Sequence, residues 1–310
     1  MRAMLEYRRC PGCGADDFEV LFNPSIEEGE LEEGVDTVYM LPGGKYGRHV
    51  RCRNCRLIYV NPIEKVAQIN NHYSEMENGD AAIIRGSRLR AARAQVELVK
   101  KYNGNTRLLD MGCGEGFFLF DASREGYITK GVELSLNAAR YARTEFGLDV
   151  DGGPFEEMRF PGDYFDVVTL WQVLEHLPQP LMALKEVYRV LRPGGLVVVS
   201  TPDIGGIPAK VLRRKWWNIR RVHINQFTTG SLMNILGNAG FGDLSSVNYK
   251  ESISLLMLFI PLLKQVRLYQ PLRALLHPGA VLGDIMNKMT LVYPSRLDNC
   301  VVAGFKNRNL

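Results

Sequence analysis

The stretch Leu108-Leu109-Asp110-Met111-Gly112-Cys113-Gly114-Glu115-Gly116-Phe117 joins an apolar run, an acidic residue and a turn with three alternating glycines. The apolar run predicts a strand, and the aromatic residues that follow the turn predict the start of a helix. Glycine allows backbone angles closed to other residues and lets a ligand approach the main chain closely. In open α/β sheets, such a turn lies at the carboxyl end of a central strand, where nucleotide-like ligands bind at a helix N-terminus.

A carboxylate follows where a nucleotide site needs one. Glu133 ends the next apolar run, Gly131-Val132-Glu133, and an acidic side chain about 20 residues after the turn is expected to bind ribose hydroxyls. In the nicotinamide-dinucleotide fingerprint, the last glycine comes three residues after the second. Here Gly116 follows Gly114 by two. This spacing disfavours a nicotinamide-dinucleotide protein, which stays an alternative.

Strands and helices alternate after the turn. The continuous run Leu196 to Ser200 is typical of a strand covered on both faces. Alternation of this kind predicts an α/β fold with a parallel, doubly wound sheet. The predicted helices are 81–102, 117–124, 135–146 and 181–191, and the predicted strands include 127–133, 165–170 and 196–200.

The predicted helix 81–102 leads into this domain and carries apolar residues at near-helical spacing. Its four arginines are most simply a solvated face, but one of them could meet a ligand carboxylate: Arg85, Arg88, Arg90 and Arg93. Tyr73, just ahead of the helix, could close over a cofactor or could cover the core.

Composition and charge place the chain among ordinary soluble globular proteins. Of its 310 residues, 46% are hydrophobic and 23% are charged, and the net charge of +4 is too small to imply a polyanionic partner. Residues Met1 to Arg9 lack an apolar run of signal-peptide length. The longest apolar stretch, Ile253 to Leu263, contains Pro261 and falls short of the ~18 residues that span a bilayer. We therefore expect a cytoplasmic protein.

Two Cys-X-X-Cys pairs lie near the N-terminus, Cys10 with Cys13 and Cys52 with Cys55. Four thiolates complete the tetrahedral shell of a structural zinc and leave no open position for a substrate. A dithiol redox pair is the alternative, but no thioredoxin-like context surrounds either pair. Residues 1–70 are therefore expected to form a small zinc-ribbon-like module that needs the metal to fold.

Several motifs occur together in the order found in one enzyme family. The motifs are Leu108 to Gly116, Gly131-Val132-Glu133, Phe165-Asp166-Val167-Val168, Val173-Leu174-Glu175-His176-Leu177 and Arg189-Val190-Leu191-Arg192-Pro193-Gly194-Gly195. The chain resembles the class I S-adenosylmethionine-dependent methyltransferases, and its cysteine module resembles that of a bacterial group including certain sugar C-methyltransferases.

The resemblance implies a seven-stranded Rossmann-like methyltransferase sheet whose last strand, Cys300 to Phe305, runs antiparallel. We expect residues 71–105 to form a helical linker and cofactor lid, and residues 106–310 to form the methyltransferase domain. The segments 203–228 and 251–295 are expected to form the acceptor pocket.

The resemblance also implies cofactor contacts. Glu133 would bind both ribose hydroxyls and Leu134 would pack on the adenine, while Phe155 stacking and Glu156 would replace the aspartate that many relatives place after the next strand. Other expected contacts are Asp110, Gly112, Cys113 and Gly114 around the methionine part, with Cys113 acting through its backbone, and Trp171, Gln172 and Val173 beside the sulfonium.

Methyl transfer is an in-line displacement, so alignment of the acceptor with the cofactor supplies much of the rate. A base matters only where the acceptor must lose a proton, and His176 and His223 are the candidates because imidazole titrates near neutrality. Both could instead be structural, since a Glu-His pair at a helix start can simply satisfy main-chain groups.

The acceptor is expected to be a small molecule, a glycan or a lipid-linked compound. An RNA methyltransferase is an alternative, because Lys210 to Arg221 carries cations around Trp216 and Trp217. The (Asp/Asn)-Pro-Pro-aromatic motif of nucleic-acid amino methylation is absent after Leu170, which argues against it. A cofactor-binding pseudoenzyme is a further alternative. Segment 253–276 could lie on a membrane surface or form a lid or dimer contact.

Overall fold

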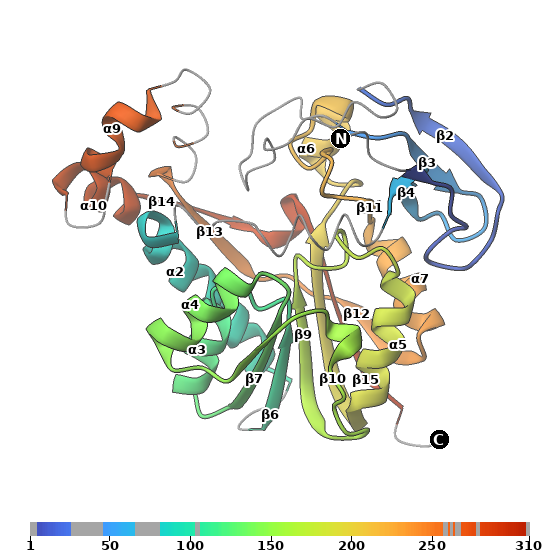
Figure 1. The fold of residues 1–310 in the computed structure, drawn as a ribbon, viewed down its shortest axis with the longest axis horizontal. Coiled ribbons are helices and arrows are strands. Elements are labelled where there is room, and N and C mark those ends of the chain that lie inside the picture. The colour runs from blue at the N-terminus through green and yellow to red at the C-terminus, as the bar shows by residue number, and fades with distance from the viewer. Residues whose placement is uncertain are drawn as a thin grey trace.

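The computed structural model of the protein describes residues 5–25, 46–65, 81–102, 106–256, 260, 263, 268–276 and 280–307. Its centre is a seven-stranded sheet made of β6 (Arg107–Met111), β7 (Ile128–Glu133), β8 (Val150–Gly152), β9 (Phe165–Trp171), β10 (Leu191–Pro202), β12 (Phe241–Ser246) and β15 (Asn299–Lys306). The strand order is β12-β15-β10-β9-β6-β7-β8 (Figure 1). Strand β15 runs antiparallel to both neighbours, whereas the other pairs are parallel. The predicted Rossmann-like sheet with an antiparallel last strand is confirmed.

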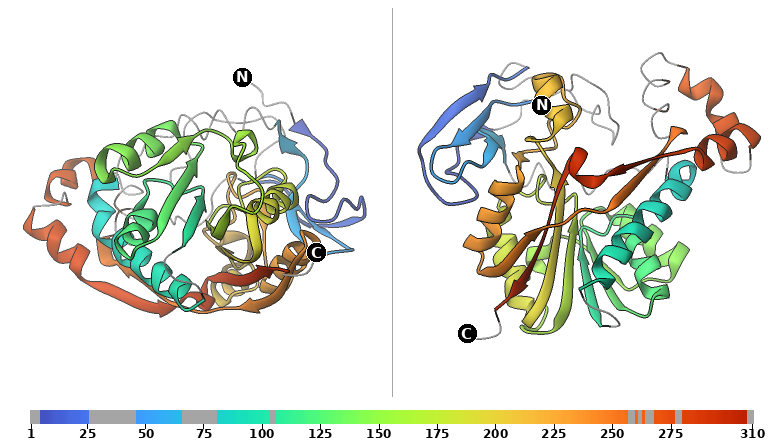
Figure 2. Two further views of the ribbon diagram at one scale, coloured as in Figure 1. Left: turned by 90° about the horizontal axis from the view of Figure 1, so that it is seen from below. Right: turned by 180° about the vertical axis from the view of Figure 1, so that it is seen from behind.

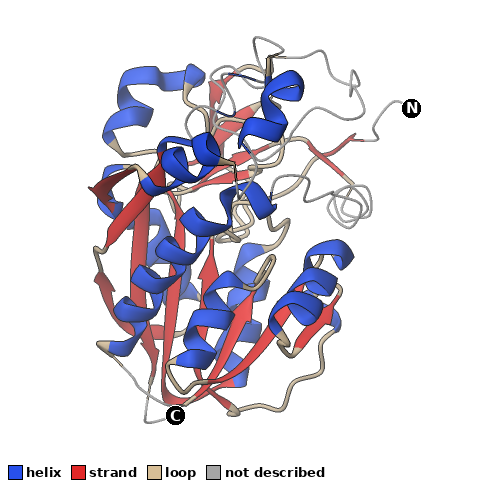
Figure 3. Cartoon of the chain, turned by 90° about the vertical axis from the view of Figure 1, so that its left-hand side faces the viewer, coloured by secondary structure: helices blue, strands red, loops and turns tan. Residues whose placement is uncertain are grey.

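Helices pack on both faces of this sheet (Figure 1), and Figure 3 shows several of them running beside the strands. One apolar core lies between the sheet and the helices α2 (Ala81–Lys100), α3 (Phe117–Arg124) and α4 (Leu136–Phe146). A second core lies under α5 (Pro180–Val190) and α7 (Thr229–Asn238). The strand residues Val197, Val198 and Val199 are fully buried because β10 lies between both layers.

The strand order places a ligand site at the carboxyl ends of β6 and β9. From β6 the chain proceeds through β7 and β8 on one side of the sheet, and then crosses to β9 and β10 on the other. Ligands of open α/β sheets bind in the crevice outside such a switch point. The glycine turn follows β6 and Gln172 follows β9, so both lie at this crevice.

The N-terminal strands form a second sheet, and one strand of this sheet comes from a much later part of the chain. Its strands are β2 (Phe18–Phe22), β3 (His49–Cys52), β4 (Ile58–Val60) and β11 (Asn225–Gln226), and a small pair joins β1 (Leu5–Glu6) to β5 (Ile63–Glu64). Strand β11 comes from the segment expected to form the acceptor pocket. The blue N-terminal strands lie beside the end of the domain that carries α7 (Figure 2), and Cys10, Leu57 and Ile235 belong to one buried cluster.

The C-terminal part before β15 forms a hairpin and two helices beside α2. These elements are β13 (Lys250–Ser254), α9 (Tyr269–Leu276), α10 (Val281–Lys288) and β14 (Thr290–Pro294). Short helices elsewhere are η1 (Phe155–Glu157), α6 (Ile207–Leu212), η2 (Arg213–Lys215) and η3 (Ser295–Leu297). Within the segment considered for membrane contact, Leu256, Ile260 and Leu276 are buried against one another. Among the described residues, no helix combines the length and hydropathy needed to cross a bilayer.

Candidate functional site

The glycine turn uses two of its glycines for different reasons. Gly112 has φ +72°, and a Cβ atom there would lie 2.6 Å from Cγ2 of Val173. Gly114 has φ +54°, and a Cβ there would meet no atom within 4 Å. Gly112 therefore allows close packing against the segment after β9, whereas Gly114 gives the turn its shape beside open space.

Asp110 closes the strand beneath the turn. Its Oδ1 accepts a hydrogen bond of 2.7 Å from the Thr169 hydroxyl on the neighbouring strand. Burial raises the pKa of Asp110 to about 8. The turn itself is anchored to β7, because the amides of Gly112 and Cys113 both donate to the carbonyl of Val132, at 2.8 and 3.1 Å.

Glu133 joins the turn to the start of α4. Its Oε2 accepts from the Gly114 amide and its Oε1 accepts from the Ser135 amide, each at 2.8 Å. Burial raises the pKa of this carboxyl group, while the hydrogen bonds from the Ser135 and Gly114 amides lower it. A carboxylate oxygen has more than one lone pair, so both oxygens can accept a further hydrogen bond from a ligand hydroxyl.

A cavity of about 600 Å³ opens beside Glu133. Its walls come from the carboxyl ends of three strands and from the turn after β9, and they include Gly112, Glu133, Leu134, Pro154, Phe155, Gln172, Val173 and His176. Phe155 is 5% exposed, so its ring belongs mainly to the core. The volume and the apolar walls suit a flat nucleoside-like group, with Glu133 as the polar contact.

A second cavity, of about 490 Å³, adjoins the first and shares Gly112, Gln172 and His176 with it. Its walls combine apolar side chains, among them Phe117, Phe118 and Ile253, with many polar and charged ones. They also include Arg88, Asp110, Cys113, Gly114, Glu115, Trp171, Glu175, Arg220, His223, Tyr249, Glu251, Tyr293 and Asn299. The two cavities thus meet at the end of β9.

Gln172 lies at this junction in a constrained conformation. Its φ is +58°, which is rare for a residue other than glycine. Its amide donates to the Ser200 carbonyl at 2.8 Å, and its Nε2 donates to the Ser200 hydroxyl at 3.0 Å. Beside it, the Trp171 ring packs edge-on against Tyr249, with centroids 6.0 Å apart.

His176 lines both cavities. Its Nδ1 donates to the Val222 carbonyl at 2.9 Å, because a carbonyl can only accept, so Nε2 carries the ring's lone pair. Nε2 lies 3.9 Å from Oε1 of Glu175. Burial and the nearby Arg220 guanidinium lower the pKa of His176 to about 4, so the ring is neutral at pH 7.

His223, the second candidate base, has hydrogen-bond partners at both ring nitrogens. Its Nδ1 donates to the Asn218 carbonyl at 3.0 Å, and its Nε2 accepts from Nε and Nη2 of Arg220, at 3.2 and 2.9 Å. Both ring nitrogens are therefore engaged, and burial keeps the pKa of the ring well below its usual value. Of the two candidate bases, His176 is therefore the one with the less fully bonded ring among the contacts described here.

Glu175 is buried in the wall of the second cavity. Neither of its carboxylate oxygens makes a well-formed hydrogen bond with another described residue, although the Thr201 hydroxyl lies beside it. Burial raises the pKa of Glu175 to about 8. A buried polar group without a full set of hydrogen bonds is costly, so Glu175 is suited to a partner that enters the cavity.

Three residues of the second cavity surround one carboxylate. Oε1 of Glu251 accepts from the Tyr249 hydroxyl at 2.9 Å and from Nδ2 of Asn299 at 2.8 Å, and Oε2 accepts from the Tyr293 hydroxyl at 2.9 Å. The group joins β13, β14 and β15. No local sequence pattern predicts the whole group, because two of the three partners, Tyr293 and Asn299, lie more than 40 residues from Glu251 along the chain.

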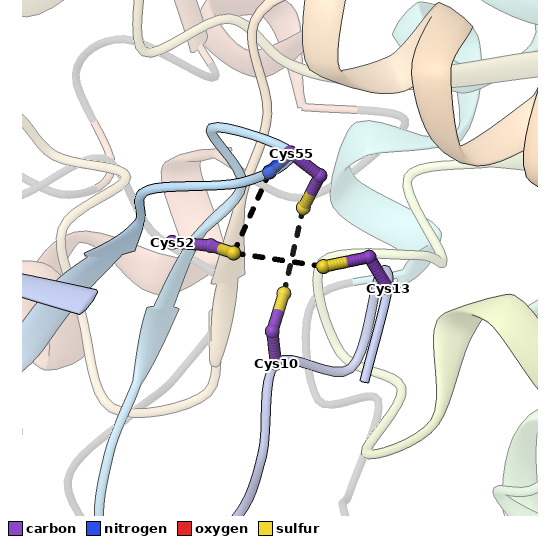
Figure 4. Close-up of side chains that lie close together, drawn as sticks. All are labelled: Cys10, Cys13, Cys52 and Cys55. Carbon is purple, nitrogen blue, oxygen red and sulfur yellow. Dashed lines mark hydrogen bonds between the residues drawn. The ribbon is translucent and has the colours of Figure 1, made fainter. Parts of the chain in front are cut away.

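The four N-terminal cysteines converge on one point (Figure 4). The Sγ atoms of Cys10 and Cys55 lie 3.5 Å apart, those of Cys13 and Cys52 lie 3.6 Å apart, and all four sulfurs lie within 4.8 Å of one another. Sulfurs about 2.3 Å from a tetrahedral zinc would be roughly 3.8 Å apart. The donor set therefore fits zinc, and the structure brings together all four predicted ligands.

Two expected cofactor contacts have no described position. Tyr73 lies outside the described residues. So do all of residues 71–80, the part of the proposed lid 71–105 that precedes α2. The side chain of Glu156 is likewise outside the description, and the neighbouring Glu157 lines the first cavity.

Comparison with known proteins identifies the family. A sequence profile described as a methyltransferase domain matches residues 83–246. The chain is a class I S-adenosylmethionine-dependent methyltransferase. The methyltransferase is 38% identical over 105 residues to a ubiquinone biosynthesis O-methyltransferase of Ralstonia nicotianae, in a match covering 31% of this chain and 42% of that protein. It is 32% identical over 140 residues to a probable S-adenosylmethionine-dependent methyltransferase of Mycolicibacterium smegmatis, covering 43% and 51%. The chain thus spans about half the length of these relatives or less.

The fold of the methyltransferase is shared with solved structures of low identity. A possible histamine N-methyltransferase of Thermotoga maritima aligns with a TM-score of 0.51 at 20% identity, covering 77% of this chain and 99% of that one. A methyltransferase of Archaeoglobus fulgidus aligns with a TM-score of 0.50 at 20% identity, covering 73% and 97%. These likenesses show the fold alone.

Proposed function

We propose that this methyltransferase moves a methyl group from S-adenosylmethionine to a hydroxyl group of a polar small molecule, such as a sugar. The observation that carries the proposal is the second cavity, whose charged and hydroxyl-bearing side chains could bind a polar acceptor and which meets the nucleoside-sized cavity at Gln172 and His176. Two of the curated relatives are named ubiquinone biosynthesis O-methyltransferases, and these names support oxygen as the methylated atom.

The cofactor would lie across both cavities. Glu133 would accept hydrogen bonds from the ribose hydroxyls, and Leu134 and Phe155 would contact the adenine. The amino-acid part would pass over Gly112 and Gly114 into the second cavity, between the turn and Arg88. This assignment uses five of the expected cofactor contacts: Glu133, Leu134, Phe155, Gly112 and Gly114.

Arg88 is the arginine of α2 that we assign to the cofactor's carboxylate. Its Nη1 lies 3.5 Å from Oε2 of Glu115, a loose ion pair next to Gly114, and its Nε is buried without a hydrogen bond to another described residue. By contrast, Arg85 pairs with Glu145 on α4 and Arg90 donates to the Asn287 carbonyl. Arg88 is therefore placed to bind an anion that enters the cavity.

Replacing Arg88 with methionine should weaken binding of S-adenosylhomocysteine by about tenfold or more, since hydrogen bonds to charged groups contribute about 1.5–3 kcal/mol. Binding of methylthioadenosine, which lacks the amino-acid carboxylate, should change less than twofold. Calorimetric titration with both ligands measures the difference. Arg93→Gln on the same helix is the control, and equal losses for both ligands would exclude the assignment.

His176 would accept the acceptor's proton. The bound cofactor would supply an electrophilic methyl group and leave as its neutral thioether, and Nε2 of His176 would accept the proton of the attacking hydroxyl. Glu175, whose Oε1 lies 3.9 Å from Nε2, would stabilise the imidazolium when it is ionised. The neutral ring at pH 7 and the buried carboxyl group support these roles.

The roles predict a pH dependence. Because the pKa of Glu175 is raised to about 8, its carboxylate forms as the pH rises through that value, and kcat/KM should rise with it. His223 and Arg220 also lie beside Glu175 and His176. Burial keeps His223 neutral near pH 8, and an arginine guanidinium stays charged there, so neither should contribute to the rise. Glu175→Gln should remove the rise, and His176→Gln should lower kcat by about 10²–10⁴-fold. A pH profile with an unaltered rise in Glu175→Gln would contradict the assignment.

The acceptor class can be tested with radiolabelled S-adenosylmethionine. The panel should contain nucleotide-linked sugars, a catechol and a transfer RNA. The measured quantity is the labelled methyl group incorporated into each compound. We expect sugars to be methylated, and methylation of the catechol alone would refute the polar-acceptor proposal. RNA is disfavoured because Trp216 is fully buried, with Nε1 donating to Asp298 at 3.2 Å, so it cannot stack on a base.

We also propose that the cysteine cluster binds one structural zinc. Four thiolates at tetrahedral spacing support this assignment, and a closed shell gives the metal no access to substrate. The chemistry of the reaction would remain with the residues of the two cavities.

A further inference from the structure

The N-terminal module contacts the acceptor side of the methyltransferase through residues 218–226, which we call the strap. In the strap, β11 extends the module's sheet, with Asn225 opposite Tyr59 and Gln226 opposite Ile58. The Val60 amide adds a hydrogen bond of 2.9 Å to the Ile224 carbonyl. The strap is therefore a strand of the module, although it lies more than 150 residues further along the chain.

Arg8 ties the module to both sides of the site. Its Nη1 donates to the Pro178 carbonyl at 2.7 Å, just after His176. Its Nη2 donates to the Ile224 carbonyl at 3.0 Å and to Oδ1 of Asn225 at 3.2 Å. Because a guanidinium is planar and has several fixed donors, one side chain can hold these groups in a single geometry.

Glu64 makes a second connection to the strap. Its two carboxylate oxygens accept from Nε and Nη2 of Arg221, at 2.6 and 2.9 Å. The side chains are 16% and 22% exposed, so the paired geometry is partly shielded from water. Bidentate pairs of this kind fix orientation as well as contributing energy.

The strap in turn holds the two residues that we assign to proton transfer. The Val222 carbonyl accepts from Nδ1 of His176 and so sets its tautomer and ring direction. The Asn225 amide donates to the Glu175 carbonyl at 3.0 Å, and Nδ2 of Asn225 donates to the carbonyls of Leu174 and Leu177. Hydrogen bonds from the module to the strap, and from the strap to the His176 ring, are thus joined through the strap's backbone.

We infer that the zinc module positions His176 and Glu175 for the acceptor, with Arg8 and Glu64 as positioning residues that act through the strap. The inference rests on the proposed role of His176. The module would then help to align the acceptor. The hydrogen bonds described above connect it to residues 174–178 and to the strap, and none of them involves Glu133 or the glycine turn. Loss of the strap's anchors is then expected to disturb the His176 ring but not cofactor binding.

The test uses the full chain labelled with [15N]histidine. The ring Nδ1–H signal of His176, assigned by its absence in His176→Gln, should be present and slow to exchange in the wild type. In Arg8→Lys and in Glu64→Gln, this signal should shift or vanish, and amide hydrogen exchange over residues 218–226 should accelerate at least tenfold. The dissociation constant for S-adenosylhomocysteine should stay within twofold of wild type.

Glu19→Gln is the matched control, because Glu19 pairs with Arg51 at 3.1 Å inside the module and does not contact the strap. It should leave the ring signal and the exchange rates unchanged. Unchanged ring and strap signals in both Arg8→Lys and Glu64→Gln, or equal changes in Glu19→Gln, would overturn the inference. Failure of the proposed function would appear separately, as full methyl transfer by His176→Gln.

Discussion

Cys52→Ser is expected to lose the bound zinc and to lower the free energy of unfolding by at least about 4 kcal/mol, since loss of a structural metal is among the largest single-site effects. Cys52 is fully buried at the end of β3. Its sulfur lies 3.6 Å from that of Cys13, and the cluster is packed against α7 through the shared core. Loss of the metal would therefore reach beyond the module.

The measurement is metal content by mass spectrometry together with thermal unfolding. One zinc per chain is expected for the wild type, and the variant should contain none and melt roughly 10 °C lower. Cys300→Ala is the control, because Cys300 is equally buried but lies on β15, where its Sγ donates to the Thr201 carbonyl. It should keep the zinc. A Cys52→Ser protein with wild-type zinc content and stability would exclude the cluster as a structural zinc site.

The regular elements were predictable because their signals are local. The helix start at Ser135 follows from a capping residue whose Oγ accepts from the Ala138 amide. Leu196 to Ser200 form a buried strand because β-branched residues follow one another without a polar interruption. Glu133 lies next to the glycine turn, as the sequence predicts, because the turn follows β6 and β7, which ends in Glu133, pairs with β6 in parallel.

The contacts that complete the site have no local signal. Strand β11 is two residues long and polar, so nothing in Asn225–Gln226 predicts that it pairs with β4. His223 is a candidate base from its position in the sequence, and its hydrogen bond from Arg220 arises only in the folded chain. Trp216 and Trp217 follow three cations, which favoured a nucleic-acid surface, but apolar burial beside Ala209 and Ile219 determines where Trp216 lies. Such outcomes depend on tertiary packing rather than on spacing.

Glu133→Ala is expected to raise the dissociation constant for S-adenosylmethionine by about 5- to 150-fold, corresponding to a loss of roughly 1–3 kcal/mol. Two effects combine in this variant. The ribose hydroxyls would lose their acceptor, and the amides of Gly114 and Ser135 would lose the carboxylate that now accepts from both. Glu133→Gln should also bind weakly, because its amide nitrogen cannot accept from a backbone N–H.

Calorimetric titration of the three proteins measures the effect, and Glu145→Gln is the matched control. Glu145 lies on α4, has a side chain that is 48% exposed and pairs with Arg85 at 3.9 Å, away from both cavities. Its variant should bind the cofactor like wild type. Binding of Glu133→Ala within twofold of wild type would contradict the ribose assignment. Wild-type affinity for a nicotinamide dinucleotide above that for S-adenosylmethionine would contradict the placement of the cofactor as a whole, because the turn from Gly112 to Gly116 would then serve a different ligand.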